Sequence, residues 1–291
     1  MQSLWMVLAA LLFALMGVCV KLASSFFTTS EIVMYRGLFG VVFLFAISRM
    51  NRVSLKTGMP LRHFSRGLTG VIALWLWFYS IGKLPLAMAN TLNYMSPIWI
   101  VAILFGLNWW HSKTRFDWKL PFAILLSFIG VVFLLQPSLH AEQLPVALIA
   151  LGSGVLSALA YLQVRKMGLM GEPETRVVFY FSLTSAISGS AAGLVDHDWH
   201  PITYPGILLL LGLGLFASTA QLAMTRAYRL GNPLLTANLS YSGIVFSSVL
   251  GVIVWQDKLS WLSWVGMLII LISGVLATYL HAQTMQSAKN T

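Results

Sequence analysis

The sequence predicts an all-α integral membrane protein with ten transmembrane helices, arranged as two inverted five-helix repeats, with both termini in the cytoplasm. Three observations lead to this prediction: the apolar composition, a series of long apolar segments, and similarity between the two halves of the chain. Of the 291 residues, 58% are hydrophobic and only 9% are charged. Soluble domains usually contain about 25% charged residues, so this chain is expected to lie in a bilayer.

The formal net charge of +10 could indicate a nucleic-acid partner. The Lys and Arg residues, however, gather in short segments between apolar runs, which is the pattern of cytoplasmic loops in multi-pass membrane proteins. No nucleic-acid partner is therefore expected. Cys19 is the only cysteine in the sequence, so the chain has no intrachain disulfide.

Ten segments are apolar enough to cross the hydrocarbon core of a bilayer, which takes roughly 20 residues. In chain order they comprise residues 3–23, 31–49, 66–82, 85–107, 119–137, 145–165, 174–195, 205–226, 233–255 and 261–281. The connections between them are short, and no stretch is long enough to form a separate soluble domain.

The first segment could be read as a signal peptide, but no positive residue precedes it. It also has a counterpart in the sixth segment, which favours a place in the fold. The matching residues of the other segments, in chain order, are Tyr79 with Tyr228 in the third and eighth, Pro85 with Pro233 in the fourth and ninth, and Gly130 with Gly274 in the fifth and tenth. The second and seventh segments match weakly. Gly189 and Gly193 of the seventh are expected to form a helix-packing seam.

These matches divide the chain into repeats of residues 1–140 and 141–291. Each repeat has an odd number of spans, so the second must enter the membrane from the side opposite to the first. This arrangement is the inverted repeat of many secondary transporters.

Charge sets the orientation. Most Lys and Arg fall on one side, including Arg49, Arg52, Lys56, Arg62 and Arg66 of the connection after the second span. The positive-inside rule therefore places both termini in the cytoplasm.

Two polar stripes are the first candidates for a substrate site. One consists of Asn90, Asn93 and Tyr94, and the other, in the matching segment, consists of Asn238, Tyr241 and Ser242. The spacing i, i+3, i+4 places each set on one helix face. A polar side chain within a membrane must find a partner or water, so the stripes either join helices or line a wet cavity. Their symmetric positions favour a cavity that suits a polar metabolite.

Aromatic residues supply a second set of candidates. Trp75 and Tyr79 of the third span and Gln221 of the eighth occupy corresponding helix faces and could contact a substrate. The alternative is that the aromatic residues face lipid, which is common in membrane helices. Tyr161 and Gln163 of the sixth span are weaker candidates.

Arg36 lies inside the second predicted span. It could bind a substrate carboxylate or phosphate, or its side chain could extend to the outer headgroups. No Asp or Glu occupies the middle of any span, so the sequence predicts no membrane-embedded carboxylate for proton coupling.

Two stretches of the sequence resemble a known family. The run QLAMTRAYRLGNPLLTANLSYSGIVFSSVLGVIVWQDKLS, from Gln221, is similar to the second-repeat signature of EamA-type carriers of the drug/metabolite transporter superfamily. The run WFYSIGKLPLAMANTLNYMSPIWIVAILFG is similar to the first-repeat pattern. Where family carriers have Gly-Glu after the ninth span, this chain has Gln256-Asp257.

The resemblance implies ten helices in two inverted repeats, with a cavity among helices 1, 3, 4, 6, 8 and 9. It also implies export or exchange of small metabolites such as amino acids, while some members import nucleotide-like compounds such as S-adenosylmethionine. The expected location is the cytoplasmic membrane of a bacterium.

Two other classes of protein compete with a transporter. A membrane-embedded enzyme would need convergent catalytic groups, and a structural subunit would not need symmetric polar stripes. The sequence has no phosphate-binding loop, nucleophile motif or metal-ligand cluster. We therefore expect a transporter with no catalytic residue, cofactor or metal ion. The protein would lie in the lipid bilayer and carry a small molecule. It would be either a monomer or a homodimer.

Overall fold

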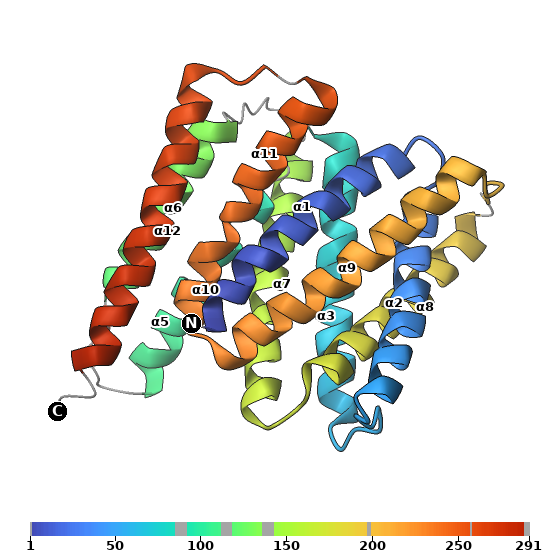
Figure 1. Ribbon diagram of the computed structural model, residues 1–291, viewed down its shortest axis with the longest axis horizontal. Coiled ribbons are helices and arrows are strands. Elements are labelled where there is room, and N and C mark those ends of the chain that lie inside the picture. Colours follow the sequence, from blue (N-terminus) through green and yellow to red (C-terminus); the bar gives the residue numbers. More distant parts are fainter. Residues whose placement is uncertain are drawn as a thin grey trace.

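A computed structural model describes residues 2–84, 92–111, 118–135, 143–196, 199–256 and 258–287. Within these ranges every regular element is a helix, as Figure 1 shows. The prediction of an all-α protein is therefore confirmed.

The helices are bounded as follows: a 3-10 turn at Gln2–Leu4, then α1 (Trp5–Ala23), α2 (Thr29–Met50), α3 (Pro60–Lys83), α5 (Ser96–His111), α6 (Lys119–Leu135), α7 (Leu144–Leu169), α8 (Glu174–Asp196), α9 (Tyr204–Leu230), α10 (Pro233–Ser240), α11 (Ser242–Trp255) and α12 (Trp261–Ser287). In the described ranges, 7 helical segments are long and apolar enough to cross a membrane, and α10 and α11 together form one of them. Shorter apolar helices occur at Ser96–Leu107 and Lys119–Leu134. The chain is thus a multi-pass membrane protein.

The helices pack mainly as pairs that join the first half of the chain to the second (Figure 1). The α6–α12 pair lies at one end of the molecule and the α2–α8 pair at the other. Between them, α1 packs on α9 and α3 packs on α7. The two halves therefore interleave, and any space at the centre is shared by both.

Glycines allow α2 and α8 to lie close together. A Cβ atom on Gly37 would meet the backbone nitrogen of Ala186, and one on Gly189 would lie 2.5 Å from the backbone nitrogen of Met34. Small residues at such contacts let helix backbones approach where lipid supplies no hydrophobic driving force. The predicted packing role of Gly189 is confirmed, and Gly193 packs on the indole of Trp199.

The segment 233–255 is not one continuous helix, contrary to the sequence-based prediction. Around Tyr241 the backbone hydrogen bonds run from residue i to i−3: Tyr241 N donates to Asn238 O (3.2 Å), and Ile244 N donates to Tyr241 O (3.0 Å). The hydroxyls of Ser240 and Ser242 bond to carbonyls three residues earlier. Serines that compete for backbone groups in this way are typical of helix irregularities.

A similar break precedes α5. Met95 N donates to Leu92 O (3.3 Å), and Ile98 N donates to Met95 O (2.9 Å). Pro97 has no amide hydrogen to give to a regular helical ladder. Both polar segments are therefore interrupted near their polar residues, which redirects the side chains that the sequence placed on single faces.

The start of α2 is held by a buried carboxylate. Thr28 and Glu31 form a capping box, and Glu31 is fully buried. The carboxylate of Glu31 also accepts the backbone N–H of His200 at 2.7 Å. These bonds hold His200, just before α9, against the start of α2, and the Glu31 carboxylate pairs with His200 and not with Arg36.

We predict that Gly37→Ala destabilises the protein by about 1–3 kcal/mol, because the added methyl group must push the α2 and α8 backbones apart. Gly17→Ala is the matched control, since a Cβ there meets nothing within 4 Å. That substitution should be neutral or stabilising by up to about 1 kcal/mol. Thermal unfolding of both variants in detergent measures the difference, and equal melting temperatures would contradict close packing at Gly37.

Candidate functional site: a central cavity

A cavity of about 630 Å³ lies among helices from both halves of the chain. This volume is in the range of small-molecule sites in proteins. The described residues that line it come chiefly from α1, α2, α3, α7 and α11, with further contributions from residues 93–96 and one residue each from α8, α9 and α10. Apart from α2 and α8, these are the segments that the family resemblance implied.

The charged residues of the cavity lining are all positive. Among the described residues, Lys21, Arg36 and Arg66 line it, and no Asp or Glu does. Much of the remaining wall is apolar, with Phe13, Leu74 and other large side chains among the lining residues. The cavity can therefore hold a compound with an apolar part and favours negative charge.

Arg36 and Arg66 are buried without counter-ions among the described residues. Their exposed fractions are 5% and 3%. Their Cζ atoms lie 5.2 and 4.4 Å from the centroid of the Phe181 ring, so both positive charges lie beside the same side chain. The Nε atoms of both arginines and Nη1 of Arg66 have no hydrogen-bond partner in the part of the chain that the structure describes.

An arginine at the centre of a membrane helix costs about 2.5–3.5 kcal/mol on insertion scales. Two neighbouring unpaired guanidinium groups are costlier, because like charges repel at short range. Gly70 makes room for one of them, since a Cβ atom there would meet Nη1 of Arg66. The fold thus accommodates two positive charges that form no ion pair with a described residue.

Gln221 completes the polar surface beside Arg36. Its exposed fraction is 9%, and its Oε1 atom has no hydrogen-bond partner among the described residues. Behind Arg36 lies a niche of about 10 Å³ lined by Gln221, Ser182, Ser185 and other residues. A space of this size is close to that of one water molecule.

Asn93 and Tyr94 also line the cavity, as the sequence predicted. Asn93 donates from Nδ2 to Ser153 Oγ at 2.8 Å, which orients its amide. Tyr161, a weaker candidate from the sequence, also lines the cavity and stacks on Tyr228 with ring centroids 5.1 Å apart. The structure therefore brings Arg36, Asn93, Tyr94 and Gln221 together around one space.

Asn238 lies elsewhere, in a helix–helix contact. Its Oδ1 atom accepts a hydrogen bond from Ser127 Oγ at 2.8 Å, and its Nδ2 atom donates to Ser273 O at 3.4 Å. These bonds join α10 to α6 and α12, and Asn238 is not among the described residues that line the cavity. Asn238 therefore joins helices in the structure, which was the alternative to lining a wet cavity.

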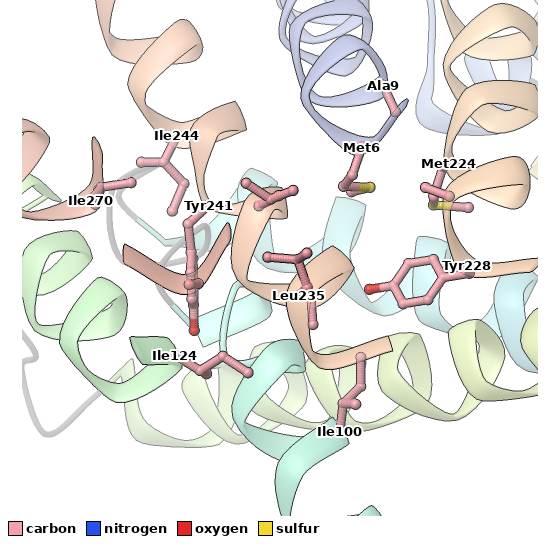
Figure 2. Packing of buried hydrophobic residues seen from close by; sticks show 14 of the residues in the cluster. Met6, Ala9, Ile100, Ile124, Met224, Tyr228, Leu235, Tyr241, Ile244 and Ile270 are labelled. Atoms are coloured by element: carbon pink, nitrogen blue, oxygen red, sulfur yellow. The ribbon is translucent and has the colours of Figure 1, made fainter. Parts of the chain in front are cut away.

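Tyr241 and Ser242 are also absent from the described cavity lining. Tyr241 is fully buried in the main hydrophobic core, near Ile244, and Figure 2 shows its ring among aliphatic side chains. Ser242 bonds to the Leu239 carbonyl of its own segment. The interruption at Tyr241 is the physical reason for this difference, because it ends the common face on which the sequence placed these residues.

The two aromatic candidates on α3 do not line the cavity either. Trp75 donates from Nε1 to Ser188 Oγ of α8 at 3.3 Å. Tyr79 has an exposed fraction of 50%, which agrees with the alternative that it faces lipid. Asn90 lies outside the described residues.

Arg66 was missed as a site residue because the charge pattern of the sequence groups it with the loop residues. The structure begins α3 at Pro60, which places Arg66 inside the helix. Proline is favoured at the first position of a helix. Pro60 was therefore the available signal that the helix starts before residue 66.

The cavity extends toward the C-terminal ends of α1 and α11. Lys21 and Ser24 of its lining are both exposed at this end, and Lys21 Nζ lies 3.9 Å from the ring centroid of Trp255. The opposite helix ends are tied together by polar contacts. Arg165 Nη1 donates to Gly231 O at 2.7 Å, and Arg229 pairs with Glu174, also at 2.7 Å.

A denser network joins the start of α3 to the start of α8. The carboxylate of Glu172 lies 2.6 Å from His63 Nε2 and 2.9 Å from Arg176 Nη1, and it accepts a hydrogen bond from Thr57. Burial alone would raise the pKa of Glu172, but the bonds from His63 and Thr57 and the charge of Arg176 lower it below its ordinary value of 4.5. The charged carboxylate therefore stabilises this closed end.

We predict that Glu172→Gln destabilises the protein at neutral pH by about 1–3 kcal/mol, because buried donors lose their ionised acceptor. The stabilisation is present above the unfolded pKa, near 4.5, and is lost as the pH falls through the lower folded pKa. The difference from wild type should therefore shrink below about pH 4.5.

Glu174→Gln is the control, because its pair with Arg229 is partly exposed and should contribute only about 0–1 kcal/mol. Melting temperatures in detergent at pH 7.5 and pH 4 give both comparisons. A Glu172→Gln effect that is independent of pH would contradict the role of the charged carboxylate.

The fold and site define a class: a helical multi-pass membrane protein whose two halves enclose a solute-sized cavity that is tied shut at one end. The family comparison agrees. The model of the EamA-like transporter family matches this chain twice, at residues 1–136 and 144–279. The chain belongs to the EamA-like transporter family, and its function is the transport of a small molecule.

Named relatives carry several different cargoes. The chain is 28% identical over 256 residues to the pseudopaline exporter CntI of Pseudomonas aeruginosa, covering 86% of each chain. It is 26% identical to a riboflavin transporter of Vibrio cholerae, covering 99% of this chain and 96% of the relative. It is 22% identical to an S-adenosylmethionine uptake transporter of Rickettsia bellii, covering 78% and 76%.

A solved crystal structure has the same fold. It superposes with a TM-score of 0.83 at 20% identity and covers 96% of this chain and 98% of the other.

Proposed function

We propose that this protein is a secondary transporter that moves a small polar metabolite across the bacterial cytoplasmic membrane by alternating access. The central cavity is the substrate site of its outward-facing state. The observation that carries this proposal is the cavity itself: it lies between both halves, holds polar groups without partners among the described residues, and reaches exposed residues at one end. Polar groups inside a membrane protein commonly mark a substrate pathway.

We further propose two inverted repeats, residues 1–140 and 141–291, with both termini in the cytoplasm. The two matches to the family model support this division. The helix pairs support it as well. Exchanging the halves converts the α1–α9 pair into α7–α3 and leaves α2–α8 and α6–α12 as they are. Both polar segments are interrupted at corresponding places, as is frequent near the sites of inverted-repeat transporters.

The proposed cargo is an amino acid or a related compound, moved by export or exchange. A relative named as an exporter supports the direction. The S-adenosylmethionine uptake transporters suggest a second candidate. The positive lining disfavours it, because Arg36 and Arg66 would repel a sulfonium cation and no described lining residue is acidic.

Filling the cavity should stop transport. We predict that Gly17→Phe, on the cavity wall, reduces transport by at least about tenfold, because the ring takes up the space for the substrate. Gly152→Phe is the control: a Cβ there also meets nothing within 4 Å, but Gly152 does not line the cavity.

Metabolite profiles of cells and medium can measure this while the cargo is still unidentified. Compounds whose distribution changes on expression of wild type and Gly152→Phe, but not of Gly17→Phe, are the cargo. If expression of Gly17→Phe changes the metabolite profile as much as expression of the wild type does, the cavity is not the site.

The proposed orientation predicts that a thiol introduced by Tyr204→Cys reacts with a membrane-impermeant reagent from outside. Leu61→Cys should react only after permeabilisation. Both native side chains are strongly exposed, at 77% and 81%, so accessibility alone does not separate them. Labelling in intact spheroplasts, in a Cys19→Ser background, measures this, and the reverse pattern would invert the topology.

A further inference from the structure

We infer that the cargo is an organic anion with two acidic groups, bound between Arg36 and Arg66 in the central cavity. This inference rests on the proposed function, since it takes the cavity to be the transport site. It goes further because it assigns Arg66 to the site and specifies the charge of the substrate.

The first ground is burial without partners. Arg36 and Arg66 are each at least nine-tenths buried, and each has guanidinium nitrogen atoms without a hydrogen bond among the described residues. Neither forms an ion pair with a described carboxylate. Buried charges in proteins are normally paired, so an unpaired set that faces a cavity indicates that a ligand supplies the partner.

The second ground is geometry. Both guanidinium groups lie over the ring of Phe181, at 5.2 and 4.4 Å from its centroid, and both line the same cavity. They reach it from different helices, α2 and α3. A guanidinium group can bind one carboxylate or phosphate through two parallel hydrogen bonds, so two such groups match two acidic groups.

The third ground is the space made for Arg66. Replacing the hydrogen of Gly70 by a Cβ would obstruct Nη1 of Arg66. Gly70 also lines the cavity and lies four residues from Arg66 on α3, so the guanidinium can lie flat against the helix at the cavity wall. Cation–π contact with Phe181 holds the charge in place without neutralising it.

The rest of the lining indicates the remainder of the ligand. Trp77, Phe78 and Phe13 supply apolar surface for a carbon skeleton. Gln221 lines both the cavity and the niche beside Arg36, so its side-chain amide is a neutral polar group next to the charges. At the exposed end, Lys21 adds a positive charge that attracts anions toward the cavity.

A charge-selective labelling experiment tests the inference without a known cargo. The reporter is Ser157→Cys, on the cavity wall, in the Cys19→Ser background of the full-length protein in proteoliposomes. The probes are two methanethiosulfonates of similar size, one with a sulfonate and one with a trimethylammonium group. The rate of each is divided by its rate at the exposed reporter Tyr204→Cys.

We expect the sulfonate to react at least about tenfold faster than the ammonium reagent, because a positive cavity concentrates anions. Arg36→Gln and Arg66→Gln should each lower this ratio, while Arg66→Lys, which keeps the charge, should preserve it. Arg62→Gln is the control, since Arg62 is exposed and lies four residues before Arg66 on the same helix. An ammonium reagent that reacts as fast as the sulfonate would overturn the inference.

A thermal-shift panel then tests the two acidic groups. The probes are glutarate, its monoamide and its diamide, followed by a metabolite set sorted by charge. Compounds with two acidic groups should stabilise wild type and Arg62→Gln, but not Arg36→Gln or Arg66→Gln. The inference is wrong if no such compound stabilises the wild type, or if stabilisation survives both substitutions.

The two proposals fail differently. Transport that Gly17→Phe blocks, together with binding of neutral or cationic compounds only, would leave the proposed function intact and overturn the anion inference. Failure of both reagents to reach the introduced thiol from outside would contradict the outward-facing cavity, and with it both proposals.

Discussion

The structure depends on one constraint: polar groups within a bilayer must be paired by the protein or by something bound to it. Most of the polar side chains in the described helices satisfy this by bonding to a neighbouring helix or to their own backbone. Asn238 bonds to Ser127 and Ser273, and Trp75 bonds to Ser188. Arg36 and Arg66 line the cavity and form no ion pair with a described residue. The hydroxyls of Tyr228 and Tyr241 also lack partners among the described residues, but they are neutral and lie in the hydrophobic core. The unpaired charges, more than the unpaired hydroxyls, therefore mark the site.

The placement of this site follows from how the two halves pack. Each main helix pair takes one helix from each half, so the centre belongs to neither half alone. At one end the buried carboxylate of Glu172, from the second half, bonds to His63 and Thr57 of the first half. A carrier that opens at this end has to break these bonds.

Relatives of this chain are named for different cargoes, including pseudopaline, riboflavin and S-adenosylmethionine. A shared fold therefore leaves the substrate open, and recognition resides in the side chains around the cavity. In this chain those side chains are positive and aromatic. Their charge, more than the volume of the cavity, is the property that would discriminate between cargoes.

The all-α membrane class, the apolar segments and the family could all be predicted from the amino-acid sequence, because hydrophobic length and motif order are local properties of the chain. The sequence also identified Arg36, Asn93, Tyr94 and Gln221, which the structure places around one cavity. The folded arrangement of the helices was needed to place Asn238 in a helix contact, Tyr241 in the core and Arg66 in the cavity. The reason is physical: a helix face is defined only while the helix continues, and a break at Tyr241 or a start at Pro60 changes where every following side chain points.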